Sequence, residues 1–248
     1  APTDAPTDAP TDAPTDAPTD APNVSPTPNV QIFGDPHFVG FLGQRFDFHG
    51  SPNTYFNLIS TPQLQVNSLF LLADLSAPRK FKTYIGAIGL RLQKRTVRIS
   101  CDRENSRKIV SIDNADFNPA SHFTEDHVTY KLSKNKRFTL ITPFIRISVR
   151  FSSSKHSSCH LNLRTKIISS IKDDDIHGIL GQTLHENKRY SVSKDEQGTG
   201  MIDGIGEDYQ LDSEDIFGTD FKFNKFSFKP YTIPSDLAIV NNISADAE

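Results

Sequence analysis

The sequence predicts an all-β fold, an antiparallel sandwich-like β-domain that follows a disordered N-terminal stalk. The main observation is a two-residue alternation of apolar and polar side chains, clearest in residues 145–151, "IRISVRF", whose four apolar residues all occupy odd positions. Turn-forming stretches such as "HGSPN", "STPQ", "SAPRK" and "FNPAS" separate the alternating runs. Stretches with a helical period are hard to find. Repeated alternation between turns favours an antiparallel sheet assembly with one buried face.

Residues 1–30 form the predicted stalk. Five copies of Ala-Pro-Thr-Asp are followed by the looser "APNVSPTPNV". Proline at every fourth position fixes φ and removes amide donors, so we expect an extended, partly polyproline-II segment. Such a stalk either holds the domain at a distance or is an inert acidic linker. Asn23 in the stalk and Asn242 near the other end lie in Asn-x-Ser triplets, which makes both candidate glycosylation sites.

The alternating runs follow one another from residue 31 to residue 228, and we interpret the range 31–228 as one β-domain. With 36% hydrophobic residues and 18 Phe, the chain has enough apolar material for one core. Residues 229–248 are predicted to be a C-terminal tail. The runs lie at residues 46–48, 64–67, 88–93 and 145–151 and, last, at 221–228, "FKFNKFSF".

Charge and hydropathy exclude two classes of partner. The formal net charge is −3, and the first twenty residues contribute five Asp and no base, so the rest of the chain is nearly neutral. A nucleic-acid-binding protein usually presents a strongly basic face, which is not expected here. No apolar run approaches the roughly 18 residues that span a bilayer, so we expect no membrane span. Because the chain begins inside a repeat without Met, we interpret it as a mature or partial product.

The two cysteines occupy matching positions on two predicted strands. Cys101 continues the spacing of Val97 and Ile99, and Cys159 begins a run that continues at Leu161. Both sulfurs should therefore point to the apolar side of their strands. They either form a disulfide, worth roughly 4 kcal/mol in the chain-entropy account, or stay as two separate buried thiols.

Three stretches carry a resemblance to a known family. "GDPHFVGFLGQRFDFHG" at 34–50 resembles the opening of the von Willebrand factor type D domain in its Gly-Asp-Pro-His form. "YFNLIS" at 55–60 is similar to that family's second strand, and "DDDIHGILGQT" at 173–183 lies where the family has a Gly-Leu-x-Gly turn. The chain also resembles the related plant root-cap and late-embryogenesis module, through "LQVNSLFL" and "GEDYQLDSEDIFGTDF". Over residues 31–228 the resemblance implies a secreted all-β module.

Two features depart from the family's pattern. Type D domains are normally rich in cysteine and commonly polymerise through disulfides, whereas this chain has two cysteines. The Asn/Asp-rich calcium loop that usually follows the family's Gly-rich turn is replaced by "GQTLHENKRYSV", which offers only Glu186 and Asn187. Disulfide polymerisation and calcium at that loop are therefore not expected.

The Asp35-Pro36-His37 triplet has two interpretations. In the first, the Asp35 carboxylate attacks its own carbonyl carbon, a cyclic anhydride forms, and His37 protonates the Pro36 nitrogen as it leaves. The resemblance implies this chemistry, because relatives with the same tetrad include mucins that cleave themselves at mildly acidic pH. Others, the heavy chains of the inter-α-inhibitor type, pass the Asp to a polysaccharide hydroxyl as an ester. In the second interpretation, Asp35 caps a turn, Pro36 begins an edge strand and His37 is a half-buried strand residue.

Other polar clusters point less clearly to a site. The acidic stretch "IDGIGEDYQLDSED" at 202–215 is either a calcium loop or a solvated loop. The pairs His122/His127 and His156/His160 lack thiol or carboxylate partners at matching spacing, so we interpret them as surface residues and not as metal ligands. Basic residues form either a face for acidic polysaccharide or a solvated sheet surface. They are Arg91, Arg95, Arg98, Lys131, Lys134, Lys136 and Arg137.

Three functions are compatible with these observations. The first is a secreted extracellular-matrix, mucilage or cell-wall adhesion protein that associates with itself, with extracellular glycans or with matrix proteins. The second is a self-processing module that cleaves at Asp35-Pro36, with an ester to a matrix hydroxyl as a further outcome. The third is a soluble glycan-binding module. The sequence lacks the motifs of serine hydrolases, zinc proteases and phosphate loops, so we expect neither turnover catalysis nor a cofactor, with calcium as the open alternative.

Overall fold

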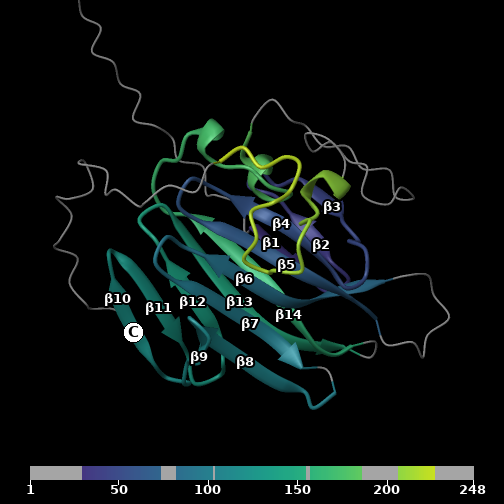
Figure 1. Ribbon diagram of the computed structural model, residues 1–248, viewed down its shortest axis with the longest axis vertical. Coiled ribbons are helices and arrows are strands. Elements are labelled where there is room, and N and C mark those ends of the chain that lie inside the picture. Colours follow the sequence, from purple (N-terminus) through teal and green to yellow (C-terminus); the bar gives the residue numbers. More distant parts are fainter. Residues whose placement is uncertain (1–29, 74–81, 103, 155–156, 186–205, 227–248) are drawn as a thin grey trace, which may run out of the picture.

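The computed structural model describes residues 30–73, 82–102, 104–154, 157–185 and 206–226 (Figure 1). These residues form fourteen β-strands in two antiparallel sheets, three short 3₁₀ helices and no α-helix. The predicted all-β antiparallel fold is therefore confirmed. Residues 1–29 and 227–248 lie outside the described residues, and so do the candidate glycosylation sites Asn23 and Asn242.

The larger sheet has eight strands in the order β10-β11-β12-β13-β14-β1-β2-β3. The first strand of the chain lies inside this sheet, where it pairs with β14 on one side and with β2 on the other. The strands are β1 (Val30–Phe33), β2 (His37–Val39), β3 (Arg45–Asp47), β10 (His122–Glu125), β11 (Val128–Leu132), β12 (Phe138–Ile141), β13 (Ile145–Ser154) and β14 (Ser157–Ile167).

The smaller sheet has six strands, β4 to β9, in chain order. Chain order means that each strand pairs with the next one along the sequence, as consecutive hairpins do. The strands are β4 (Thr54–Ser60), β5 (Gln65–Leu72), β6 (Thr83–Arg91), β7 (Thr96–Asp102), β8 (Arg107–Ile112) and β9 (Ala115–Asp116). The 3₁₀ helices are η1 (Asp173–Asp175), η2 (Gly181–Leu184) and η3 (Gly206–Tyr209).

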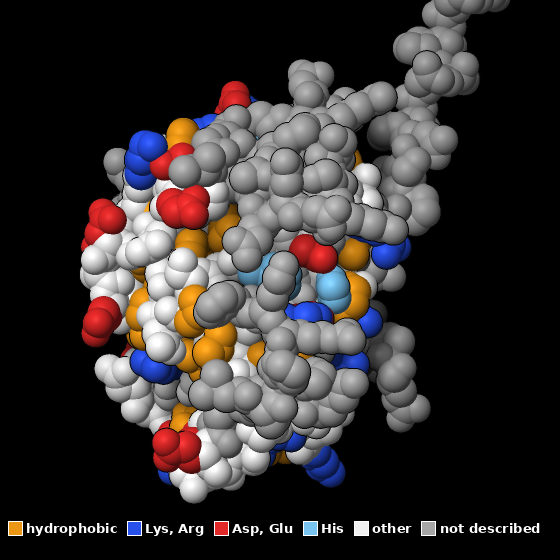
Figure 2. Space-filling model, turned by 90° about the vertical axis from the view of Figure 1, so that its right-hand side faces the viewer, with side chains coloured by type: hydrophobic (Ala, Val, Ile, Leu, Met, Phe, Trp, Pro, Cys, Tyr) orange, Lys and Arg blue, Asp and Glu red, His pale blue; other side chains and the backbone are white. Residues whose placement is uncertain are grey.

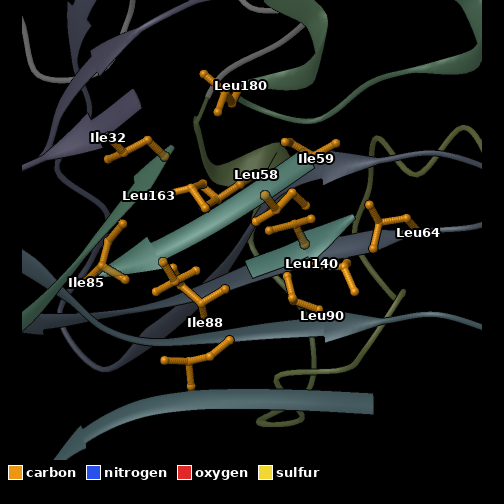
Figure 3. Packing of buried hydrophobic residues seen from close by; sticks show 14 of the residues in the cluster. Ile32, Leu58, Ile59, Leu64, Ile85, Ile88, Leu90, Leu140, Leu163 and Leu180 are labelled. Atoms are coloured by element: carbon orange, nitrogen blue, oxygen red, sulfur yellow. The ribbon is translucent and has the colours of Figure 1, made fainter. Parts of the chain in front are cut away.

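The two sheets pack face to face around one hydrophobic core. Figure 3 shows residues of both sheets in this core, among them Ile32 and Leu163 from the larger sheet and Ile85 and Ile88 from the smaller one. All four side chains are fully buried. Because burying an aliphatic side chain of this size contributes about 1.5–3 kcal/mol, the inward-facing residues of the alternating strands hold the sandwich together.

A group of phenylalanine rings fixes the hairpin formed by β2 and β3. The Phe38 ring stacks on the Phe46 ring with centroids 4.9 Å apart, and Phe48 lies edge-on to Phe38 at 6.0 Å. Phe48 also makes edge contacts with Phe56 and Phe70 of the smaller sheet, at 5.2 and 5.5 Å. Tilted and edge-on aromatic pairs of this kind are favourable. The hairpin that begins at His37 is therefore anchored to both sheets.

A disulfide joins Cys101 of β7 to Cys159 of β14, with their Cα atoms 5.9 Å apart. Both residues are buried. Of the two alternatives that the sequence left open, the disulfide is confirmed. Because β7 belongs to the smaller sheet and β14 to the larger one, the bond links the two layers of the sandwich covalently.

Strands β4 to β6 are buried on both faces, whereas the alternation predicted one exposed face. All residues of β6 except Arg91 are buried. The outer face is covered by a later segment of the chain. The carbonyl oxygens of Ile216 and Gly218 accept hydrogen bonds from the Asn67 side chain of β5, and a Cβ on Gly89 of β6 would lie 2.7 Å from the Ile216 carbonyl oxygen. The residues on the outer face of the smaller sheet are therefore buried by the covering segment.

The strand predicted over residues 221–228 is wrong for residues 221–226, the part that the structure describes. This segment is irregular. Phe221 is nevertheless buried, and the Phe223 ring stacks on that of Tyr209 with centroids 5.8 Å apart. The alternation arises because these phenylalanines pack onto the outside of the smaller sheet without joining it.

Candidate functional site

The turn between β1 and β2 contains Gly34, Asp35 and Pro36. Gly34 has a φ of +65°, in the left-handed region that favours glycine. Its amide donates a hydrogen bond to Asn162 Oδ1 of β14 at 3.2 Å, which ties the turn to the neighbouring strand. Asp35 thus occupies a turn, as both interpretations of the triplet predicted. The predicted edge strand is wrong, because β2 lies between β1 and β3.

His37 is the first residue of β2 and lies between two carboxylates. Its Nε2 atom is 3.1 Å from Asp35 Oδ1, and its Nδ1 atom is 2.7 Å from Asp47 Oδ1. The second contact follows from the hairpin, because His37 and Asp47 are paired residues of β2 and β3. An ionised carboxylate only accepts hydrogen bonds, so the doubly protonated imidazole, which donates from both nitrogens, satisfies both contacts.

Lys82 brings a third charged group to this turn from the other sheet. Its Nζ atom donates to Asp35 Oδ2. The residue immediately precedes β6 of the smaller sheet, whereas Asp35 follows β1 of the larger one. The site therefore spans the junction of the two sheets. Sequence reasoning missed Lys82, and no local sequence pattern points to it.

The surroundings of Asp35 keep its carboxylate ionised. Burial is the largest single influence and would raise the pKa of Asp35. The hydrogen bond and charge of Lys82, a backbone hydrogen bond and the charge of His37 together outweigh it, so the pKa lies below the ordinary value. The side chain of Asp35 is 17% exposed and that of His37 is 43% exposed. The group that would act as nucleophile is thus charged and shielded, while the acid beside it reaches solvent.

His49 is a second histidine near this cluster, and sequence reasoning missed it too. Burial lowers the pKa of His49, and the charges of Asp47 and Asp35 oppose that effect. Its Nδ1 atom is buried without a hydrogen-bond partner. Figure 2 shows histidine side chains beside acidic and basic ones near the middle of one face of the molecule.

The Gly-rich stretch at 173–183 lies against the β2–β3 hairpin. Thr183 accepts a hydrogen bond from the Phe41 amide at its Oγ1 atom (2.9 Å) and one from Gln44 Nε2 at its carbonyl oxygen (2.9 Å). Gly178 has a φ of +99°, and a Cβ there would lie 2.6 Å from the Leu58 carbonyl oxygen. These two motifs, distant in sequence, therefore form one substructure that holds the hairpin in place.

The predicted alternatives for metal binding gain no support from the described residues. Among them, no group of three or more His, Cys, Asp or Glu side chains could hold a metal ion. Asp208 of the acidic stretch is buried and pairs with Lys222 at 2.6 Å, so this part of the stretch is not a solvated loop. Asp203, Glu186 and Asn187 lie outside the described residues.

The histidine pairs differ in their surroundings. His122 and His127 are exposed, as predicted. His160 is buried, with its ring 4.9 Å from that of Tyr84, so the predicted surface position is wrong for this residue. The reason is that His160 faces the smaller sheet from β14. His156 lies outside the described residues.

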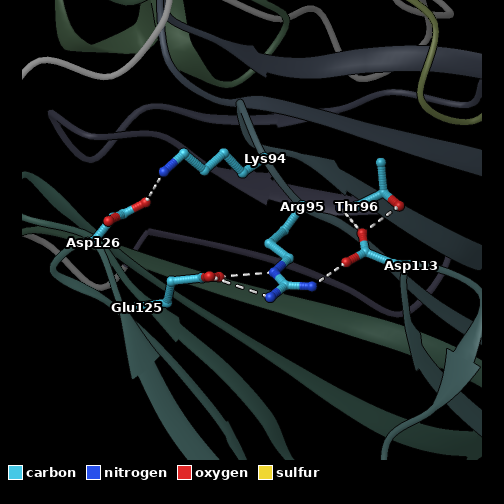
Figure 4. A network of polar contacts seen from close by, with 6 residues as sticks. All are labelled: Lys94, Arg95, Thr96, Asp113, Glu125 and Asp126. Carbon is cyan, nitrogen blue, oxygen red and sulfur yellow. Dashed lines mark hydrogen bonds and ion pairs between the residues drawn. The ribbon is translucent and has the colours of Figure 1, made fainter.

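A network of ion pairs connects the sheets through their connecting turns (Figure 4). Lys94 pairs with Asp126 at 2.8 Å. The guanidinium group of Arg95 pairs with Glu125 at 2.7 Å and with Asp113 at 2.6 Å. Lys94 and Arg95 lie between β6 and β7, whereas Glu125 is the last residue of β10 and Asp126 lies in the turn that follows it. One of the basic residues considered for polysaccharide binding is thus neutralised by acidic partners within the protein.

Comparison with known proteins gives one informative match. The chain is similar to inter-alpha-trypsin inhibitor heavy chain H2 of Mesocricetus auratus, with 24% identity over 230 residues. The aligned region covers 79% of this chain, and the chain spans about a quarter of the relative's length (24%). No family model matches the chain, so the type D resemblance stays a prediction. Within the described ranges, no helix is long and apolar enough to cross a membrane.

Proposed function

We propose that this chain is a secreted adhesion or structural module of an extracellular matrix, mucilage or cell wall, and that Asp35-Pro36 is a self-processing bond within it. Three observations support an extracellular role. The Cys101–Cys159 disulfide is typical of oxidising compartments. The Pro/Thr/Asp repeats suit an extended spacer. Most of this chain, 79% of it, is similar to part of inter-alpha-trypsin inhibitor heavy chain H2.

The observation that carries the self-processing proposal is the contact of His37 Nε2 with Asp35 Oδ1 at 3.1 Å. It brings the His37 imidazole next to the carboxylate that would attack, and Asp47 lies 2.7 Å from the opposite nitrogen of the ring. An Asp-Pro bond is suited to scission because the proline nitrogen is a tertiary amide and leaves well once it is protonated.

The step balances as follows. A carboxylate oxygen of Asp35 forms a bond to the Asp35 carbonyl carbon, and the bond from that carbon to the Pro36 nitrogen breaks. The proline nitrogen takes the proton of the His37 imidazolium and becomes a secondary amine. The products are a five-membered cyclic anhydride on Asp35 and neutral His37. Water then opens the anhydride to two carboxyl groups, whereas a matrix hydroxyl would open it to an ester.

Intact-mass measurement under denaturing conditions tests this function. After incubation at about pH 5 to 6, we expect pieces 1–35 and 36–248 with a combined gain of one water. Both cysteines lie in the second piece, so no disulfide holds the pieces together. The variants His37→Gln and Asp35→Asn should stay intact under the same conditions. A wild-type chain that stays intact for days at every pH tested would exclude self-processing.

A deletion tests the matrix role separately. Because β1 begins at Val30, the variant should lack residues 1–29 and keep Val30, whose side chain is buried. We expect the full chain in the insoluble extracellular fraction and the deletion variant in the soluble one. Material released from that fraction by mild alkali would indicate an ester link. Equal solubility of both forms would instead favour the soluble glycan-binding module.

A further inference from the structure

Both oxygens of the Asp35 carboxylate are engaged in the folded protein. Oδ1 lies 3.1 Å from His37 Nε2, and Oδ2 accepts a hydrogen bond from Lys82 Nζ. Each contact lowers the nucleophilicity of the oxygen involved, because a nearby cation stabilises the negative charge that would otherwise form the new bond. The partners of the two oxygens differ in role, because His37 is the proton donor of the proposed reaction and Lys82 has no part in it.

The position of Lys82 is fixed by its backbone. Its carbonyl oxygen accepts a hydrogen bond from the Ala73 amide at 2.7 Å, which pairs it with the end of β5. The following residue, Thr83, is buried and begins β6. The side chain of Lys82 is 46% exposed. The ammonium group is therefore held near Asp35 by a rigid strand end, yet it can be replaced without opening the core.

We propose that Lys82 is a latch that slows scission of the Asp35-Pro36 bond by holding the Asp35 carboxylate in an ion pair. This inference rests on the proposed self-processing. In the ground state the negative charge lies on the carboxylate, next to the Lys82 ammonium. As the carbon–oxygen bond forms, that charge moves to the carbonyl oxygen. Lys82 thus stabilises the ground state more than the transition state, and such an interaction lowers the rate.

The other charged groups near Asp35 do not duplicate this role. His37 occupies the other oxygen, and Asp47 contacts His37. His49 shares no hydrogen bond with Asp35 among the described contacts, and its Nδ1 atom is buried without a partner. Burial would raise the pKa of Asp35, and the hydrogen bond from Lys82 is the largest influence that lowers it, which agrees with an ion pair between the two groups. Removal of the ammonium charge should therefore act on Asp35 and leave the donor in place.

Scission rates of the full chain carrying Lys82→Gln test the latch. On the plateau of each rate profile, where the rate no longer changes with the ionisation of Asp35, we expect scission about threefold to tenfold faster than in wild type, since partly exposed ion pairs are of modest strength. Lys82→Arg keeps the charge and should restore the slow rate. Lys131→Gln removes an exposed lysine from β11 and should leave the rate unchanged.

The pH dependence of the scission rate is a second measurement, and it should not change if Lys82 serves only to stabilise the fold. Without Lys82 the pKa of Asp35 rises, so the acid limb of the rate profile should shift to higher pH in Lys82→Gln and return in Lys82→Arg. A rate in Lys82→Gln that equals or falls below that of wild type would overturn the latch and leave self-processing intact. Scission in Lys82→Gln alone would support both proposals. No scission in either form would exclude self-processing itself.

Discussion

Removal of the Cys101–Cys159 disulfide should destabilise the sandwich strongly. The bond closes a loop with a sequence separation of 58 residues. In the chain-entropy account, a loop of that length contributes roughly 4 kcal/mol, because the cross-link restricts the unfolded chain. For a domain of about 200 residues, each kcal/mol corresponds to a shift of about 2–4 °C in Tm. The double variant Cys101→Ala/Cys159→Ala should therefore unfold at a Tm about 8–16 °C lower.

Thermal unfolding followed by circular dichroism measures this shift. A strong reductant supplies the matched control, since it should lower the Tm of the wild type toward that of the double variant and leave the double variant unchanged. Alanine at both positions avoids burying a hydroxyl group where the native side chains are buried. A double variant within about 2 °C of the wild type would show that the cross-link between the sheets adds little to native packing and would refute the estimate.

Three further predictions concern other parts of the molecule. Asp47→Asn keeps a hydrogen-bond acceptor for His37 but removes the negative charge. Scission, measured by intact mass, should therefore slow by about twofold to fivefold. An unchanged rate would contradict the idea that Asp47 positions His37. Gly178→Ala places a Cβ 2.6 Å from the Leu58 carbonyl oxygen, at a residue whose φ is +99°. Urea unfolding should show that the free energy of unfolding falls by at least about 1–2 kcal/mol. An unchanged free energy of unfolding would mean that the turn adjusts to the Cβ without cost. Arg95→Gln removes the centre of an exposed ion-pair network, so unfolding should depend less on salt than in wild type; an equal salt dependence would show that the network is not stabilising.

Alternation in the sequence is most informative for a strand that has one face on the core and the other toward solvent. β13 is the clearest case, because its buried residues are the odd-numbered ones of the predicted run. For β6 the predicted strand is present but the expected exposed face is not, because the covering segment buries the outer face as well. The same reasoning failed for residues 221–226, where alternating phenylalanines pack as part of a cover and not as a strand. Periodicity reports which side chains are buried, and it does not identify the element that buries them.

The candidate site shows the same division between local and distant information. Asp35, Pro36 and His37 were found from sequence because they are consecutive. Asp47 was within reach of sequence reasoning, since a hairpin with its turn between residues 40 and 44 places residues 37 and 47 opposite each other.

Lys82 was not within reach, because it comes from the other sheet and meets Asp35 only when the two layers pack. Two other links also join one sheet to the other: the Cys101–Cys159 disulfide, which the sequence left as one of two alternatives, and the Arg95–Glu125 ion pair. Which residues of one sheet meet which residues of the other depends on the packing of the whole core. Strand pairing within a hairpin depends only on a short stretch of sequence. The residues that would start scission are thus encoded locally. The residue that would restrain it is set by the tertiary fold, so a variant that loosens the packing between the sheets should weaken the restraint without any change at the Asp-Pro bond itself.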